Sequence, residues 1–581
     1  MATPGDNQLP RFERQFFDAA ESSTRIGRGA IGGKAAGLER VRRDILPRLD
    51  PAAHPQFRLS VPRMTVLTTG LFERFMERNG LYPVALSDAP DERIAHAFQQ
   101  GDLPAEYVGD LLALIRDVHT PLAVRSSSLL EDALAHPFAG VYGTKMIPNN
   151  QPSAEARFQR LVEAIKFVYA SAFFAGAKSY LRSIDRPPDA EQMAVVIQEI
   201  VGERRNERFY PHLSGVARSF NYYPSGRSRP EEGVVNLALG LGKQIVDGGL
   251  SWTYCPARPQ APPPFANIGE RLKNSQTVFW AVGMGKPPAP DPTRETEYLV
   301  RAGLAEAELD GTLEFLVSTL DPRSDRLRPG LAAAGPRVLD FAPILTGGAL
   351  DLNPLLQELL RETERELGAA VEIEFALTLD RRRAHPARFG FLQARPMMVS
   401  TGEVEIATAE KEEAGRLIYS TSALGNGVRE DIRDVVYVRP DVFEAKHTPR
   451  IALEIERLNR ELVAQGRPYL LIGFGRWGSS DPWLGIPVEW GQISGARALV
   501  ETTLPQMNPD LSQGSHFFHN LISFQVLYFS VRSAEGRGVA WPWLEAQPAL
   551  AETSFLRHIQ GAQPLVIKVD GRRGEGVIRH A

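Results

Sequence analysis

The sequence predicts an α+β or α/β protein that folds as more than one domain. Its 581 residues exceed what one hydrophobic core normally holds and correspond to about three or four folding units. Strand-length runs of β-branched residues alternate along the chain with longer amphipathic helical patterns. A polar, acid-rich stretch at residues 400–416 separates the two main regions. We therefore expect a lead at 1–19, a first unit at 20–400 and a smaller α/β companion domain at 401–581.

The composition is that of a soluble globular protein without a strong net charge. The chain has 66 basic and 70 acidic residues, a net charge of -4, so we expect neither nucleic acid nor an anionic membrane as a partner. Cys255 is the single cysteine, which excludes an intrachain disulfide and a thiolate metal cluster. The sequence shows neither a signal-peptide pattern nor an apolar run of about 18 residues. A complete, cytoplasmic protein is the expectation, and a homodimer is left open.

The early elements of the first region follow from local patterns. Residues 25–46 join a glycine-rich turn to a helix with apolar positions among charged ones. Residues 61–80 predict a strand, a Thr-capped turn and an amphipathic helix. Residues 121–128 predict a short strand that runs into a loop, and helical patterns fill residues 153–182.

β-Branched residues mark the later strands. Residues 192–201 form a run suited to a central buried strand. Residues 371–379 and 388–399 predict neighbouring strands that follow a long helix at 354–368. Further strands are expected at 212–220, 233–242, 564–571 and 574–580.

Two basic residues stand beside small, flexible ones. In GGKAAGL, Lys34 follows a glycine turn at a helix start, where backbone N–H groups and a point charge suit phosphate oxygens. In VRSSS, the planar guanidinium of Arg125 suits phosphate, and Ser126 and Ser127 offer hydroxyls and free amides. Each motif also fits a purely structural role, as a helix entry in the first case and a surface loop in the second.

Two pairs of polar residues alternate on the neighbouring strands. Glu372 and Glu374 in VEIEF share one face because side chains alternate with period two. Two like charges repel unless a cation lies between them, and hard oxygen ligands suit magnesium. Gln393 and Arg395 in FLQARP likewise share a face of the next strand. The alternatives are a solvated face for the two acids and an edge strand stopped by Pro396.

Seven segments occur in an order that resembles a known family. They are IGGKAAGL, VPRMTVLTTGLFERFM, VRSSSLLEDALAHPFAGVYGT, MAVVIQEIV, VVNLALGLGKQIVDGG, VEIEF and FLQARP. In this order they resemble the nucleotide-binding domain of the phosphoenolpyruvate synthase and pyruvate phosphate dikinase family across residues 20–400. The resemblance implies an ATP-grasp fold that clamps ATP between two α+β lobes. It also implies that the loop after Arg125 is a mobile lid over the nucleotide phosphates.

The resemblance further assigns a phosphate and metal site. Lys34 and Arg125 would neutralise the transferring phosphates, and Arg395 would clamp phosphate. Glu374 and Gln393 would hold Mg²⁺. Catalysis would then consist of positioning and charge stabilisation, with ATP and Mg²⁺ as cofactors and no catalytic nucleophile in this domain.

The remaining implied roles concern the nucleotide itself. Gln198, Glu199 and Ile200 would present backbone groups to the adenine edge, and Glu372 would lie near the metal.

This chain also departs from the family pattern. Family members usually carry Asp where Glu372 stands. A GVAFTRDP-like segment is replaced by GVARSFNYYPSG at residues 215–226, which puts an expected phosphate contact in doubt. The phosphohistidine domain and the TIM barrel of a full dikinase are not visible, and about 180 remaining residues are too few for an eight-stranded barrel. The complete dikinase relay is therefore not expected within this chain.

The second region holds a glycine-rich loop. Gly473, Gly475 and Gly478 have the spacing G-x-G-x-x-G after a strand-like run, and a second strand-like run ends in Glu501. A dinucleotide loop, another anion- or substrate-binding loop and plain structural turns are all open, although prolines follow where a dinucleotide motif needs a helix. The loop also carries recognition-type side chains, namely Arg476, Trp477, Asp481 and Trp483.

Two histidines lie three residues apart in SQGSHFFHNL. His516 and His519 would share one face of a helix, where metal binding or phosphoryl acceptance is open. The alternative is a satisfied core or interface pair. Together with Arg476 and Asp481, these histidines are candidates for a second site.

The sequence-based hypothesis is an ATP- and magnesium-dependent phosphotransferase. Its acceptor would be a small molecule, a separate protein or the companion domain. The alternative is a non-catalytic regulatory or sensor protein in which ATP repositions the two halves. The altered segment at 215–226 favours that alternative. Catalysis is favoured by the retained phosphate and metal residues, Lys34, Arg125, Glu374, Gln393 and Arg395.

Overall fold

The computed structural model shows a protein of mixed α and β structure with two compact units, which confirms the predicted α+β multidomain class. Unit 1 comprises residues 1–219, 232–245 and 250–397, and unit 2 comprises 220–231, 246–249 and 398–581.

No helix in the described part of the chain is long and apolar enough to cross a membrane. The structure describes residues 9–14, 23–129, 131, 140–183, 186–221, 224, 227–247, 249–261, 268–273, 275–331, 334–380, 385–397, 399, 404–411, 415–479, 481–504, 521, 526–532, 538–571 and 573–580.

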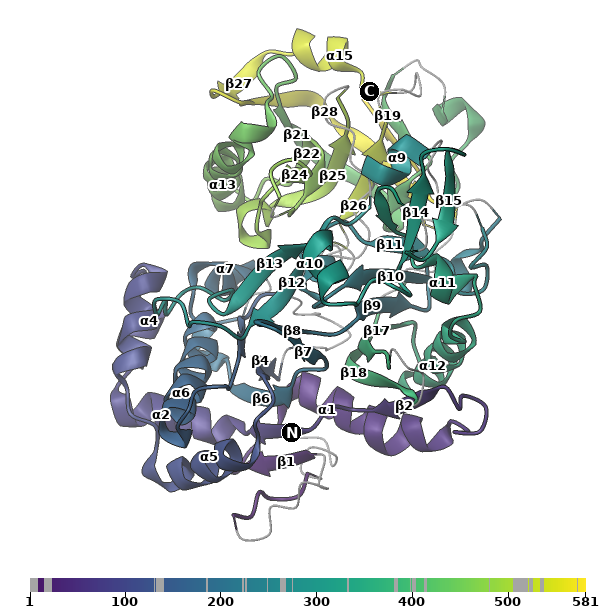
Figure 1. The fold of residues 1–581 in the computed structure, drawn as a ribbon. Coiled ribbons are helices and arrows are strands. Elements are labelled where there is room, and N and C mark those ends of the chain that lie inside the picture. Colours follow the sequence, from purple (N-terminus) through teal and green to yellow (C-terminus); the bar gives the residue numbers. More distant parts are fainter. Residues whose placement is uncertain are drawn as a thin grey trace. The chain divides into compact units, whose positions relative to one another are not determined.

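The first sheet of unit 1 has five strands. Its order is β1 (Ser23–Ile26), β3 (Met64–Leu67), β6 (Met193–Glu199), β4 (Leu122–Ser128) and β5 (Thr144–Ile147). Strand β6 is central and pairs antiparallel with β3 and β4, as the apolar run at 192–201 predicts. Figure 1 shows helices beside this sheet in purple and blue: α2 (Thr69–Asn79), α4 (Asp91–Gln100), α5 (Ala105–Asp117), α6 (Ala154–Ser171) and α7 (Ala175–Ser183). The short helix α3 (Tyr82–Leu86) follows α2 in the chain.

Two details of this region differ from the predictions. Thr68 precedes α2, but its side chain makes no capping hydrogen bond; its hydroxyl points to the carbonyls of Arg28 at 2.9 Å and Ile26 at 3.3 Å. Strand β4 confirms the strand predicted at 121–128, but it includes Ser126 and Ser127, which the phosphate-binding interpretation places in the loop after Arg125. They pair with β6, which the local sequence does not indicate.

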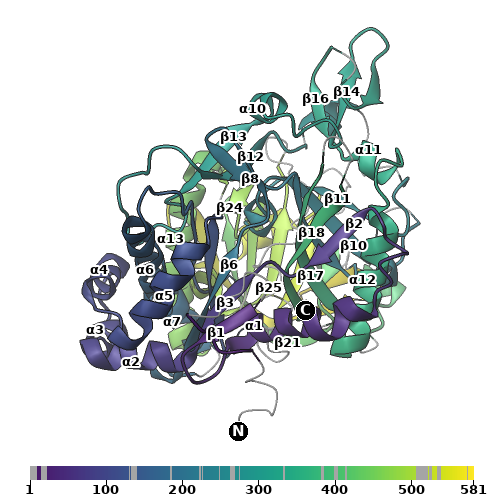
Figure 2. The same ribbon diagram turned by 60° about the horizontal axis from the view of Figure 1, so that its bottom comes forward.

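The second sheet of unit 1 has six strands. Its order is β11 (Trp252–Tyr254), β10 (Val234–Leu239), β9 (Leu213–Arg218), β17 (Val371–Thr378), β18 (Ala387–Pro396) and β2 (Phe57–Ser60). Helix α12 (Leu352–Leu367) buries a leucine stripe in the core of this sheet, and helix α1 (Gly32–Arg40) also packs on β18. Figure 2 shows α12 beside β17 and β10.

Smaller elements complete unit 1. One additional sheet has the order β13 (Leu299–Gly303), β12 (Val278–Gly283), β8 (Arg208–Tyr210) and β7 (Glu203–Arg205), and the other has the order β15 (Arg326–Pro329), β14 (Val317–Asp321) and β16 (Arg337–Leu339). The short helices are η1 (Val41–Ile45), η2 (Leu46–Arg48), η3 (Pro188–Ala190), α9 (Ile268–Lys273), α10 (Leu304–Leu309) and α11 (Ala342–Leu345). Two more, η4 (Pro230–Glu232) and α8 (Lys243–Val246), lie where the chain passes between the units.

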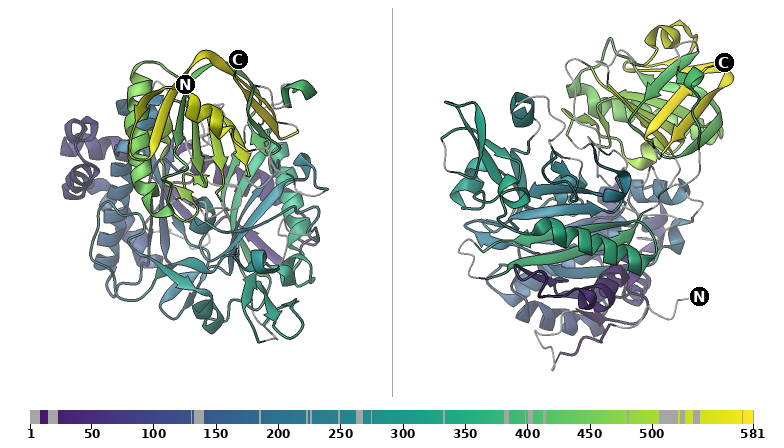
Figure 3. Two further views of the ribbon diagram at one scale, coloured as in Figure 1. Left: turned by 90° about the horizontal axis from the view of Figure 1, so that it is seen from above. Right: turned by 90° about the vertical axis from the view of Figure 1, so that its right-hand side faces the viewer.

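Unit 2 is built on a nine-stranded sheet, drawn in green and yellow in the right panel of Figure 3. Strands β21, β22, β25 and β26 are neighbours that run parallel, and helix α13 (Thr448–Ala464) connects β21 to β22. The order is β19 (Arg416–Ser420), β29 (Glu575–Arg579), β28 (Leu556–Asp570), β21 (Gly427–Val438), β22 (Tyr469–Phe474), β25 (Ala496–Thr502), β26 (Leu527–Val531) and β20 (Ala423–Leu424), with β27 (Ala549–Glu552) on β28. The remaining elements are η5 (Thr408–Lys411), η6 (Ala445–His447), β23 (Arg476–Trp477), β24 (Gly485–Ile486), η7 (Trp490–Ile493) and α15 (Trp541–Ala546).

Candidate functional site

The hairpin of β17 and β18 presents four polar side chains on one face of the six-stranded sheet. Glu372 pairs directly with Arg395, and Glu374 pairs directly with Gln393. Because side chains alternate along a strand, these four share one face, as the two sequence motifs predict. Glu372 and Arg395 therefore form a first row on this face, and Glu374 and Gln393 form a second row beside it.

The first row is a buried triad of charges. Arg395 donates to Glu372 Oε1 from Nε at 3.0 Å and from Nη2 at 2.5 Å. Arg218, from the adjacent strand β9, lies 2.6 Å from Glu372 Oε2 through Nη2 and donates through Nη1 to Asn236 at 3.0 Å. All three charged side chains are at least nine-tenths buried. Two guanidinium groups therefore provide the positive charge that the sequence motif predicts beside Glu372.

Arg218 was missed by the sequence reasoning. It lies in the altered segment GVARSF, where its partner could not be recognised without the strand pairing. Strand β9 pairs with β17 so that Arg218 stands opposite Glu372, more than 150 residues later in the chain. The sequence signal is an arginine at the end of a mostly apolar strand.

A β-bulge joins the second row to the other sheet of unit 1. Gln393 pairs with Glu374 and Phe391 pairs with Phe375, so Leu392 is an extra residue with no opposite residue in β17. The Leu392 carbonyl accepts a hydrogen bond from Arg125 Nη1 at 2.7 Å. Because Arg125 belongs to β4, this bond joins the five-stranded sheet to strand β18 of the six-stranded sheet.

The guanidinium of Arg125 lies between the two predicted metal ligands. Its Nη2 donates to Gln393 Oε1 at 2.8 Å and lies 3.6 Å from Glu374 Oε2. Arg125 and Glu374 keep side-chain exposures of 14% and 13%, whereas the triad of the first row is more deeply buried. A carboxylate and an amide oxygen are donors that suit Mg²⁺, provided that phosphate oxygens or water complete the set. The pair therefore fits the implied metal in donor type.

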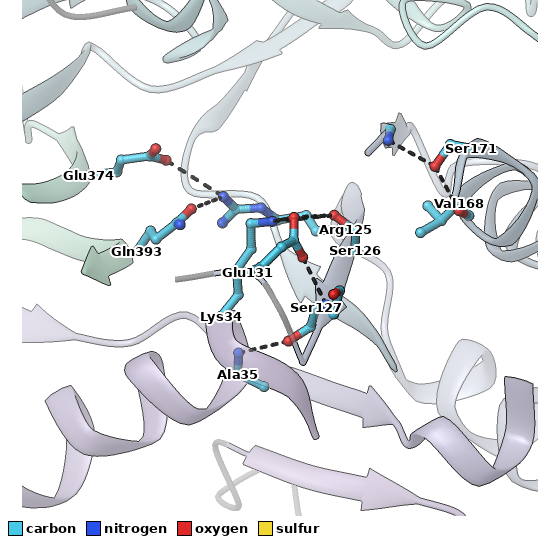
Figure 4. Close-up of polar contacts among 12 residues, drawn as sticks. Lys34, Ala35, Arg125, Ser126, Ser127, Glu131, Val168, Ser171, Glu374 and Gln393 are labelled. Carbon is cyan, nitrogen blue, oxygen red and sulfur yellow. Dashed lines mark hydrogen bonds and ion pairs between the residues drawn. The ribbon is translucent and has the colours of Figure 1, made fainter. Parts of the chain in front are cut away.

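Lys34 is paired with an acid of the loop that follows β4. Its ammonium group forms an ion pair with Glu131 and lies 3.3 Å from Ser126 Oγ (Figure 4). The Glu131 carboxylate also accepts from Ser126 Oγ at 3.0 Å and from the Ser128 amide at 2.9 Å. An ammonium, a hydroxyl and a backbone amide are the donors that a phosphate group would require. Glu131, which the sequence reasoning did not single out, accepts from donors of the types that bind phosphate.

Ser127 holds the start of helix α1 against strand β4. Its Oγ accepts from the Ala35 amide at 3.1 Å and donates to the Ile31 carbonyl at 2.9 Å. Gly32 has φ +76°, and a Cβ there would lie 1.6 Å from the Ser127 carbonyl oxygen. Ser127 is therefore a positioning residue for Lys34, and its hydroxyl is not directed at a ligand.

A second carboxyl group is buried beside this loop. No hydrogen bond of normal geometry reaches either oxygen of Glu191 from the described residues. Burial raises the pKa of Glu191 to about 7, which the nearby hydroxyls of Ser128 and Tyr142 only partly offset. The charge of Glu131 raises this pKa further. Glu191 is consequently a group that titrates near neutral pH.

The predicted adenine-edge residues lie at the end of β6. The Glu199 amide donates to the Arg63 carbonyl and the Ile200 amide to the Pro121 carbonyl, each at 2.9 Å. These two amides are therefore engaged within the protein. The Gln198 side chain is buried, and its Nε2 has no hydrogen-bond partner among the described residues.

The candidates for a second site lie in unit 2. Arg476 starts β23 after a left-handed Gly475, and no helix follows Gly478 in the described residues before η7, so the dinucleotide interpretation is not supported. Asp481 forms a turn in the same loop, where its Oδ1 accepts from the Trp483 amide at 3.0 Å. His516 and His519 lie outside the described residues.

Comparison with known proteins places these motifs in a family. The pyruvate phosphate dikinase AMP/ATP-binding domain family matches residues 28–415. A phosphoenolpyruvate synthase of Aeropyrum pernix is 27% identical over 242 residues, which are 38% of this chain and 26% of that protein. The uncharacterized phosphotransferase YvkC of Bacillus subtilis is 24% identical over 239 residues, 41% of this chain and 24% of that protein. The chain thus spans about a quarter of the length of these relatives. Because the family match covers most of the sequence, the chain belongs to the pyruvate phosphate dikinase AMP/ATP-binding domain family.

Proposed function

We propose that this protein binds ATP and Mg²⁺ in an ATP-grasp domain and transfers a phosphoryl group to an acceptor. The observation that carries the proposal is the convergence of Lys34 from α1, Arg125 from β4 and the Glu374–Gln393 row from β17 and β18. These groups come from separate segments and from both large sheets of unit 1. A shared ligand explains why these side chains meet better than a shared structural role does.

The phosphates of ATP would replace the internal acids. Lys34 would exchange Glu131 for a phosphate oxygen, and the Ser128 amide and Ser126 hydroxyl released with it would donate to the same group. Arg125 would turn from Glu374 and Gln393 toward phosphate. Arg395 forms an ion pair with Glu372 in the neighbouring row. It would keep this ion pair when ATP binds, and its positive charge would stabilise the phosphate from there.

Glu374 and Gln393 would hold the metal once Arg125 has moved. When bound there, Mg²⁺ would neutralise phosphate charge and orient the phosphates. Glu372 would act on this site only by holding Arg218 and Arg395 in place. Gln198, Glu199 and Ile200 would line the adenine. These residues position and neutralise, and none is required as a nucleophile.

The acceptor would be a small molecule, a separate protein or unit 2 itself. In the last case the phosphoryl group would be carried by His516 or His519. We further propose that residues 20–400 form the nucleotide-binding domain and residues 401–581 a companion domain. A homodimer and a cytoplasmic location also remain predictions.

Two measurements test the proposal. ATP with Mg²⁺ should raise the melting temperature through binding to the folded state, and Lys34→Ala should reduce that shift. Arg43→Ala is the matched control, because Arg43 is an exposed residue whose guanidinium pairs with its neighbour Asp44. An unchanged melting curve at saturating ATP would exclude the nucleotide site. The fate of the β- and γ-phosphates of labelled ATP then identifies the product and the acceptor class.

A non-catalytic sensor is the second candidate. It is favoured by the pairing of Lys34 with Glu131 and of Arg125 with Glu374, since ATP would replace both ion pairs and release Glu131 from Lys34. In that case ATP should bind with no loss of its γ-phosphate during prolonged incubation with acceptor-containing extract. Transfer to any acceptor would reject the sensor.

A further inference from the structure

Unit 1 contains a cavity at the turn end of the hairpin of β17 and β18. Its volume is about 410 Å³. The lining residues come from three parts of the chain, which are residues 55–56 before β2, the segment 315–350 that includes α11, and residues 379–380 and 385–387 at the turn. Sites that bury a small organic molecule usually have volumes of about 300–1,000 Å³. The cavity is therefore large enough for such a ligand.

The wall of the cavity belongs to the hydrophobic core of unit 1. Ile344, Leu379 and Ala387 are buried core residues, and Phe315 and Leu350 pack against the same core. Water beside such a wall finds few hydrogen-bond partners, and an apolar ligand surface that replaces it is removed from water. The wall therefore favours a ligand with an apolar body.

Hydrogen bonds of Gln56 hold the three parts of the lining together. The Gln56 carbonyl accepts from the Ala387 amide at 2.8 Å, and Gln56 Oε1 accepts from the Asp351 amide at 2.8 Å. The Ala349 amide donates to the Pro343 carbonyl at 3.0 Å, which fixes the segment between α11 and α12. A cavity held in this way is formed before a ligand binds, so binding requires little ordering of the protein.

The side chain of Gln56 also supplies a hydrogen-bond donor to the cavity. Gln56 is half-buried and is one of the lining residues. Because Oε1 is used by the Asp351 amide, Nε2 is the remaining polar group, and it has no partner among the described residues. A carbonyl or ether oxygen of a ligand is the acceptor that suits this donor.

The charges at the cavity favour an uncharged ligand. The Asp380 carboxylate belongs to the lining, and its Oδ2 already accepts from the His385 amide at 2.9 Å. None of the described lining residues is a lysine or an arginine. A charged ligand would therefore lose its hydration without gaining a free partner of opposite charge, which is costly.

We propose that this cavity binds a small uncharged organic molecule with an apolar body and a carbonyl or ether oxygen. The apolar body would pack on Ile344, Leu379 and Phe315, and the oxygen would accept a hydrogen bond from Gln56 Nε2. Extended strand separates Leu379 from Glu374 by about 15 Å, so the cavity is distinct from the proposed metal site. The site stands whether or not unit 1 transfers phosphate.

The test uses the full chain and the probe prodan, an uncharged dimethylaminonaphthalene with one ketone. Its emission should shift to the blue as it leaves water for the cavity, and the shift should saturate with a dissociation constant at or below about 10 µM. Saturating ATP with Mg²⁺ should leave the titration unchanged, because the cavity lies apart from the proposed nucleotide site. Displacement of prodan by ATP, or the absence of a saturable shift, overturns the proposal.

Two lining variants and a control locate the bound probe. Ala349→Trp adds an indole to the half-buried wall of the cavity and should abolish the saturable shift. Gln56→Glu keeps an acceptor for the Asp351 amide but removes the donor, and it should weaken binding about tenfold. Ala105→Trp, at an exposed position at the start of α5, is the control and should bind prodan as the wild type does. An unchanged affinity in Gln56→Glu, which still decides the matter if Ala349→Trp does not fold, overturns the proposal.

Discussion

Two neighbouring rows on the same sheet face use charge in different ways. In the row of Arg218, Glu372 and Arg395, each guanidinium lies 2.5–3.0 Å from the Glu372 carboxylate, and all three side chains are almost fully buried. In the row of Glu374 and Gln393, Arg125 is 3.6 Å from the carboxylate and both groups keep some exposure. Both rows lie on the same pair of strands, β17 and β18. They differ in burial and in the strand that supplies the additional arginine, which is β9 for Arg218 and β4 for Arg125.

The comparison separates charges that hold the fold from charges that are available to a ligand. Breaking a buried ion pair leaves an uncompensated charge at low dielectric, which is strongly unfavourable. A partly exposed pair at 3.6 Å contributes little to stability and can exchange partners. We therefore expect substitutions in the first row to change folding and those in the second row to change chemistry.

The largest effect is expected for Glu372→Gln. The variant removes the negative charge from between two buried guanidinium groups and should lower the free energy of unfolding by about 3–5 kcal/mol. Denaturant unfolding of unit 1 measures this loss. Glu374→Gln is the matched control and should lower stability by less than about 1 kcal/mol. Equal losses in both variants would contradict the division between the rows.

The next effect concerns turnover. Glu374→Gln removes a charge at constant shape and should lower phosphoryl transfer at least about 100-fold, equivalent to ~2.7 kcal/mol of transition-state stabilisation. Transfer from labelled ATP measures this, with the melting temperature as the folding control. A fully active Glu374→Gln protein would place the metal elsewhere.

A smaller effect of opposite sign is expected for Glu131→Gln. ATP must displace Glu131 from Lys34, so removal of the competing charge should tighten ATP binding about fivefold, or ~1 kcal/mol. Titration calorimetry with ATP and Mg²⁺ measures the change. Glu308→Gln, which breaks an ion pair with Arg337 elsewhere in unit 1, is the control and should leave the affinity unchanged. Weaker binding in Glu131→Gln would show that Glu131 supports the ligand.

A last effect is a dependence of stability on pH. Burial raises the pKa of Glu191 from 4.5 to about 7, so the folded state binds this proton more tightly than the unfolded state. The contribution of Glu191 to stability should therefore fall as pH rises between these values. Unfolding at about pH 5 and about pH 8 should show this loss, and Glu191→Gln should reduce it. An identical pH dependence in the variant would contradict the shift.

The site could be predicted from sequence where strand periodicity decides the outcome. Alternation placed Glu372, Glu374, Gln393 and Arg395 on one face, and the hairpin register confirms it. The central position of β6 followed from its β-branched run in the same way.

The remainder depends on pairings between distant segments. Neither the opposition of Arg218 to Glu372 nor the pairing of Lys34 with Glu131 has a local signal, because each arises from contacts across about 100 residues or more. Ser127 was expected at a ligand, but strand pairing turns its hydroxyl to helix α1.

The bulge at Leu392 also bears on how this hairpin tolerates changes in length. Loss of one residue from a paired strand normally inverts every side chain beyond it. Here Leu392 is the unmatched residue, so its deletion would restore regular alternation with Gln393 opposite Glu374 and Phe391 opposite Phe375. The sheet could therefore survive a single-codon deletion that removes the carbonyl acceptor of Arg125. Natural length variation at this position would mark relatives in which that arginine is held differently.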